Sequence, residues 1–253
     1  MTAIADALTF LIFGILGGFL GSILGIGGGS LMTPLLLAAG YDILVAVPAS
    51  LLAIVGTSIG GLYVYEEKRL IRYDLAIYAE SITIPGSITG VLIASAGFKQ
   101  VMKITLAAIL IIISLEMIRS YLKENKSNNR LNRKVERPVL GFASMYFAGL
   151  ISALSGIGGG VLKVPILTRL LGMDVKEAVA TSKLMVGITG AAGALGYFVG
   201  GFMNSCLALS LLAGSLIGGL LGSKTGVKLS GRTIAFLFSG FLMIMAVVVV
   251  VRG

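Results

Sequence analysis

Apolar residues occur in runs of about twenty along most of the chain, the length that a helix needs to cross a bilayer. Short polar stretches separate these runs. Within the apolar runs, apolar and polar positions do not alternate as they do in the strands of a membrane barrel. The pattern therefore predicts an all-α polytopic membrane protein. The predicted crossings are 43–65, 75–97, 104–118, 178–202, 206–222 and 233–251, with a short turn at 98–102, and the apolar segments 4–26 and 139–157 begin the two halves.

Two glycine clusters interrupt this pattern at matched places. Gly25-Ile26-Gly27-Gly28-Gly29 and Gly156-Ile157-Gly158-Gly159-Gly160 are each followed, five residues later, by a proline, Pro34 or Pro165. Because each glycine costs a helix roughly 1 kcal/mol against alanine, the clusters predict broken helices. The short apolar stretches 30–39 and 161–171 then form the return arms of two hairpins.

The amino-acid composition limits which disulfide, metal and cofactor chemistry the protein can carry. Hydrophobic residues make up 57% of the chain and charged residues 12%, with one cysteine, Cys206, and no histidine. An intramolecular disulfide is excluded, zinc or iron–sulfur chemistry is disfavoured, and we expect no cofactor. The net charge of +9 lies in the polar loops and does not indicate a nucleic-acid partner. No Lys or Arg precedes the first apolar run, so we expect that run to be retained rather than cleaved as a signal.

The second half of the sequence repeats the first. Ser50 matches Ser182, Thr57 matches Thr189, and Gly86-Ser87 matches Gly214-Ser215. The pattern predicts a first membrane repeat at 1–120, a basic linker at 121–138 and a second membrane repeat at 139–253.

Positive charge orients the repeats, because cytoplasmic loops are enriched in Lys and Arg. With the linker inside, fifteen of the twenty Lys and Arg residues lie on the cytoplasmic side, and Lys99, Lys103 and Arg252 lie outside. Each half is a broken hairpin plus three crossings, so the two repeats are predicted to be inverted. This places a multi-pass protein in the cytoplasmic membrane with both termini outside.

Inverted repeats with paired broken helices are typical of secondary transporters, which bind substrate between the halves. Helix N-termini at the two breaks would favour an anion. The alternative is that the glycines only allow close helix packing. The predicted substrate-binding residues are Gly27, Gly28, Gly29, Ser30, Thr33, Ser50, Ser155, Gly158, Gly159, Gly160, Lys163, Ser182 and Lys183.

Lys163 and Lys183 fall inside apolar segments, where a charge is costly and usually faces the protein interior or a cavity. Both are candidates for anion binding. The alternatives are snorkelling to the interface for Lys163 and an ion pair with Glu80 or Glu116 for Lys183. Glu80 is a candidate proton carrier, with interfacial solvation or a helix-end ion pair as alternatives. Asp42 and Asp174 precede crossing segments and are predicted to cap them.

The pattern Gly-x-x-x-Gly-Ile-Gly-Gly-Gly, with the later proline, a Gly-x-Asp turn and an Ala-Val-x-x-Ser stretch, resembles the sulfite exporter TauE/SafE family in both halves. By position, the family signature falls on Gly25–Gly29, Pro34, Ser50, Gly156–Gly160, Pro165, Thr181 and Ser182. The resemblance implies a secondary transporter of small sulfur-containing anions such as sulfite, sulfoacetate or other organosulfonates. Some thiosulfate importers of the family carry several cysteines near the pathway, and Cys206 alone departs from them.

Export of such an anion by alternating access is therefore the predicted function. Protons are a candidate coupling ion, and membrane lipid is expected to surround the protein. Uptake of thiosulfate or another small anion is the alternative. An integral membrane enzyme is disfavoured because no polar catalytic constellation is evident. A homodimer is left open as an oligomeric state.

Overall fold

The computed structural model describes residues 2–23, 29–67, 69–122, 138–226 and 242–249, and every regular element in these ranges is helical. This confirms the predicted all-α class. A last helix covers residues 242–249. The preceding helices are α1 (Thr2–Ile23), α2 (Gly29–Ala38), α3 (Ile43–Glu66), α4 (Tyr73–Ser95), α5 (Lys99–Leu122), α6 (Pro138–Ser155), α7 (Gly160–Pro165), the π-helix η1 (Ile166–Leu170), α8 (Val175–Val199) and α9 (Ser205–Gly226).

Four of these helices, α3, α4, α8 and α9, are long and apolar enough to cross a membrane. Their bounds lie close to the predicted crossings. The predicted turn at 98–102 is wrong in extent, because α5 already begins at Lys99. The reversal is confined to Ala96, Gly97 and Phe98, with Gly97 at φ +90°, so Lys99 and Gln100 form the exposed first turn of α5.

Two aspartates begin the central helices in the same way. Asp42 before α3 and Asp174 before α8 both have extended backbone, with φ/ψ of −64°/147° and −60°/146°. Each side chain accepts a hydrogen bond at 2.9 Å from the N–H two residues later, Leu44 or Lys176. The capping prediction is therefore confirmed for both.

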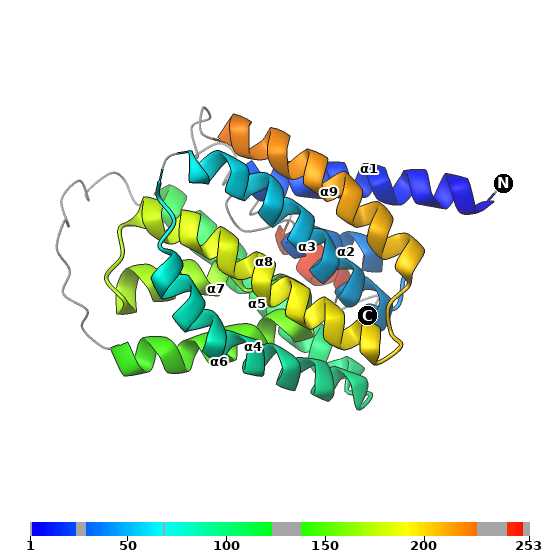
Figure 1. The fold of residues 1–253 in the computed structure, drawn as a ribbon. Coiled ribbons are helices and arrows are strands. Elements are labelled where there is room, and N and C mark those ends of the chain that lie inside the picture. The colour runs from blue at the N-terminus through cyan, green and yellow to red at the C-terminus, as the bar shows by residue number, and fades with distance from the viewer. Residues whose placement is uncertain (1, 24–28, 68, 123–137, 227–241, 250–253) are drawn as a thin grey trace.

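The helices pack in pairs drawn from different halves of the sequence. α1 lies along α9, α4 lies along α6, and α3 and α8 contact each other between these pairs (Figure 1). Small residues allow the close approach: Gly18 in α1 rests on Ser215 in α9, and Gly149 in α6 rests on Ser87 in α4, each without room for a Cβ. The outer helices of each half are therefore covered by the other half.

α3 runs through the interior of this arrangement. Its face formed by Val47, Leu51 and Ile54 is fully buried. That face belongs to one apolar cluster with Val186 of α8 and Ile157 of the second glycine cluster. The glycine hairpins are consequently held against the two central helices.

Candidate functional site

The second glycine cluster breaks the helix as predicted. α6 ends at Ser155, and Gly156, Gly158 and Gly159 have φ of +71°, +82° and +69°, values that glycine adopts without strain. The return arm starts at Gly160 as α7 and continues as η1. Pro165, which has no N–H to donate, stands where the α-helix gives way to the π-helix.

The first hairpin has a matching outline. α1 ends at Ile23 and the return arm α2 starts at Gly29. Gly27 and Gly28 lie outside the described residues, as does the side chain of Ser30. The described part of this hairpin therefore consists of its two arms, α1 and α2.

The return arm of the first hairpin touches the second glycine cluster. Thr33 in α2 donates a hydrogen bond to the carbonyl oxygen of Gly156 at 3.4 Å, and Thr33 is fully buried. A Cβ at Gly156 would collide with the Thr33 hydroxyl, so glycine is required here for contact as well as for φ. Gly158 lies against Ile54 and Val186 of the central helices.

Lys163, in α7, is held by protein groups. Its ammonium lies 2.7 Å from a carboxylate oxygen of Glu80 in α4 and donates at 3.0 Å to the carbonyl oxygen of Met185 in α8. It also donates to the hydroxyl of Thr189, which in turn donates to the other oxygen of Glu80 at 2.6 Å. Lys163 and Glu80 are 0% and 2% exposed, so snorkelling of Lys163 and interfacial solvation of Glu80 are both wrong.

The other half has an apolar cluster at the matching place. Met32 and Lys163 each lie seven residues after the first glycine of their cluster, and Ala208 and Glu80 each lie six residues before a matched Gly-Ser pair. Met32 and Ala208 are buried in one apolar cluster. Only Thr57, which matches Thr189, keeps its hydroxyl, and that hydroxyl donates to the carbonyl of Ile54 within its own helix. The buried ion pair is thus particular to the second hairpin.

Lys183 has different surroundings. It is 3% exposed, and its ammonium has one polar neighbour in the described part of the chain, the hydroxyl of Ser22 at 3.5 Å. No carboxylate of the described residues pairs with it. The predicted alternative of a pair with Glu80 is wrong because Lys163 occupies that carboxylate, and the side chain of Glu116 lies outside the described residues.

Gly61 and Ser223 also lie beside Lys183 and, like Ser22, are not among the predicted site residues. The side chain of Lys183 passes over Gly61 in α3, where a Cβ would lie 3.3 Å from its Cδ. The Ser223 hydroxyl lies 3.4 Å from the same point and has no hydrogen-bond partner among the described atoms. Both residues lie on small-residue faces that look like ordinary helix packing, which hides them in the sequence. We refer to Lys183, Ser22, Gly61 and Ser223 as the Lys183 cluster.

The remaining predicted residues stay within their own helices. Ser155 and Ser182 donate to the carbonyl oxygens of Ile151 and Val179. Ser50 is buried and has no partner among the described atoms. Ser58 of α3, which is not a predicted residue, packs against Gly187 of α8, and its hydroxyl donates to the carbonyl oxygen of Lys183. The structure therefore places Thr33 at the contact with Gly156, Lys163 in a network with Glu80, and Lys183 in a separate cluster. Among the described residues, Ser50, Ser155 and Ser182 make no hydrogen bond to any of the three.

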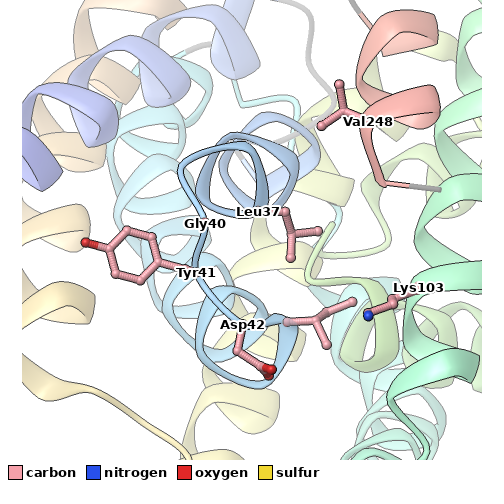
Figure 2. Close-up of a pocket in the computed structure, with 7 residues that line it drawn as sticks. Leu37, Gly40, Tyr41, Asp42, Lys103 and Val248 are labelled. Carbon is pink, nitrogen blue, oxygen red and sulfur yellow. The ribbon is translucent and has the colours of Figure 1, made fainter. Parts of the chain in front are cut away.

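An open pocket of about 490 Å³ lies elsewhere, at the end of α2. The turn from Leu37 to Ile43 forms one side, and Lys103 of α5 and Val248 of the last helix form the other (Figure 2). Asp42 at this pocket pairs with Lys99 at 2.7 Å. No predicted substrate-binding residue lines the pocket, so it is separate from the candidate site.

Sequence comparisons identify relatives across nearly the whole length. The family described as Sulfite exporter TauE/SafE matches residues 10–249. "Probable membrane transporter protein YunE" of Bacillus subtilis is 27% identical, covering 96% of this chain and 94% of its own. A "Probable membrane transporter protein" of Haemophilus influenzae is also 27% identical, covering 94% and 95%. No solved structure gives a significant match.

Proposed function

The chain belongs to the TauE/SafE sulfite exporter family and is a multi-pass membrane transporter, and from this premise we propose that it exports a small sulfur-containing anion by alternating access. Sulfite and organosulfonates, including sulfoacetate, are the proposed substrates. Uptake of thiosulfate or another small anion is the competing function, and a transport experiment decides between export and uptake.

The proposed mechanism uses two inverted repeats that rock about a site between them. The pairing of α1 with α9 and of α6 with α4 supports this, because the duplication matches α1 to α6 and α9 to α4, so the two pairs are equivalent. The Gly18–Ser215 and Gly149–Ser87 contacts involve residues matched by the sequence duplication. The proposal places the linker in the cytoplasm and both termini outside.

One observation carries the choice of an anion: Lys183 is buried in a membrane protein without a carboxylate among the described residues to balance it. Such a charge is expensive unless a ligand or water compensates it. A bound anion would compensate it and would also accept from the hydroxyls of Ser22 and Ser223. Lys163 is a less suitable ligand because Glu80 already neutralises it.

The test is transport by the purified protein in proteoliposomes loaded with radiolabelled sulfite, with and without a proton gradient. We expect Lys183→Met to abolish or strongly reduce efflux. Lys176→Met is the matched control, because Lys176 is an exposed lysine on the same helix and should transport normally. Unchanged transport by Lys183→Met would contradict the proposed site. Absence of sulfite or sulfonate transport by the wild type would contradict the proposed substrates.

A further inference from the structure

The described residues bury three charged side chains, Glu80, Lys163 and Lys183. The first two form an ion pair of 2.7 Å and cancel each other. Lys183 is therefore left with one positive charge in the interior. The charge that a ligand must bring to restore neutrality is a single negative charge.

The groups that the described residues place next to Lys183 are neutral. Ser22 and Ser223 each contribute a hydroxyl, and Gly61 contributes only backbone. The neighbouring Ser58 hydroxyl is used by the carbonyl oxygen of Lys183. An ammonium has three donor hydrogens and a hydroxyl has one, so the cluster can serve the oxygens of a sulfonate or hydrogen sulfite but supplies no second cation.

We infer that the Lys183 cluster selects monoanions against dianions of the same shape. The inference rests on the proposed function, since it concerns the substrate of that same site. A monoanion makes the buried site neutral, whereas a dianion leaves one negative charge without a partner in a medium where an unpaired charge is costly. Hydrogen sulfite and simple alkanesulfonates are then the preferred substrates. The inference thereby narrows the proposed substrates, because sulfate, thiosulfate and sulfoacetate, which carry two charges at neutral pH, are disfavoured.

Methanesulfonate and sulfate are suitable probes because a methyl group in one replaces a charged oxygen in the other, while the tetrahedral sulfur is kept. Their binding to the wild-type protein in detergent can be measured by calorimetry at neutral pH. We expect methanesulfonate to bind at least about tenfold more tightly, a modest factor for a buried charge mismatch. Ethanesulfonate and sulfoacetate form a second pair of a monoanion and a dianion. In sulfoacetate the second negative charge lies further from the sulfur than it does in sulfate.

Lys183→Arg, which keeps the charge, should retain the preference for methanesulfonate, and Lys183→Met should lose affinity for it. Equal or tighter binding of sulfate by the wild type, still dependent on Lys183, would overturn the charge selectivity but leave anion transport intact. Binding of neither anion, together with absence of sulfite transport, would overturn the proposed function itself.

Discussion

Thr33 and Gly156, which are 123 positions apart in sequence, meet in the interior, where the Thr33 hydroxyl donates to the Gly156 carbonyl oxygen. Thr33 belongs to the return arm of the first hairpin and Gly156 begins the second glycine cluster. The two hairpins are therefore in direct contact. The contact joins the two halves of the sequence, which makes it a place to test both stability and transport.

Gly156→Ala should destabilise the protein for two separable reasons. A non-glycine residue at φ +71° costs about 1 kcal/mol or more, and the new Cβ would collide with the Thr33 hydroxyl. Adding Thr33→Ala removes the collision but not the backbone cost. We expect the double variant to recover part of the thermal unfolding midpoint lost by Gly156→Ala, measured in detergent.

Gly201→Ala is the control for the backbone cost alone. Gly201 has φ of +78° and nothing within 4 Å of its Cβ position. Its substitution should therefore cost less than Gly156→Ala and should show no coupling to Thr33→Ala. Equal losses for the two alanine variants would mean that the Thr33–Gly156 contact adds nothing to stability.

Glu80→Ala and Lys163→Met should each be strongly destabilising on their own. Removing one member of a buried ion pair leaves the other charge unpaired and typically costs 3–5 kcal/mol, as a rough guide. The double variant copies the Met32 and Ala208 arrangement of the other half. We expect it to regain much of the lost stability, as measured by thermal unfolding of the purified variants.

Transport by this double variant also tests the predicted proton-carrying role of Glu80. If Glu80 carries the coupling proton, the double variant should fold and still bind methanesulfonate, but its sulfite transport should no longer respond to a proton gradient. A preserved response would assign the pair to structure alone. Failure of the double variant to recover stability would contradict the equivalence of the two arrangements.

Much of the fold could be predicted because its signals are local. Apolar runs of membrane length locate α3, α4, α8 and α9, consecutive glycines locate the break after α6, and Asp42 and Asp174 mark the starts of two helices. Each of these depends on neighbouring residues in the sequence, through propensity, capping or length.

The partners of buried charges could not be predicted in the same way. Glu80 lies 83 positions from Lys163, and pairing it with Lys183 is equally compatible with the sequence. Which lysine pairs with Glu80 depends on the face of α8 that contacts α4. Ser223 and Gly61 were missed for the same reason, because their proximity to Lys183 arises only when α3, α8 and α9 pack together.

The proposed orientation predicts one-sided labelling of the linker. In a Cys206→Ser background, a cysteine introduced at Ser127 should react with a membrane-impermeant maleimide only after the cell membrane is opened. The reason is the excess of Lys and Arg between residues 119 and 137, which favours the cytoplasmic side. A cysteine at Gln100, on the opposite side in this topology, is the matched control and should react in intact cells. Reversed labelling of the two positions would contradict the orientation.

Asp42 and Asp174 provide a final comparison, because they cap their helices alike but differ in charge partners. Lys99 pairs with Asp42, whereas the described residues show no ion pair at Asp174. Partial burial raises the pKa of Asp42, but the hydrogen bonds from Lys99 and from the Leu44 N–H outweigh it, so the pKa lies below its ordinary value. A lowered folded-state pKa stabilises the fold above the unfolded-state pKa, and this contribution is lost as the pH falls through the folded-state value.

Asparagine keeps the cap but removes the charge, so Asp42→Asn should cost at most about 1 kcal/mol near neutral pH, as an exposed ion pair does. The difference from wild type should disappear in acid, where the wild-type carboxyl is also neutral. Asp174→Asn should be close to wild type near neutral pH, and Asp42→Ala should lose about 0.5–2 kcal/mol for the cap in addition. Thermal unfolding across a pH series measures all three. Equal effects of the two asparagine variants at neutral pH would show that the Lys99 pair contributes nothing and that only the caps stabilise these helix starts.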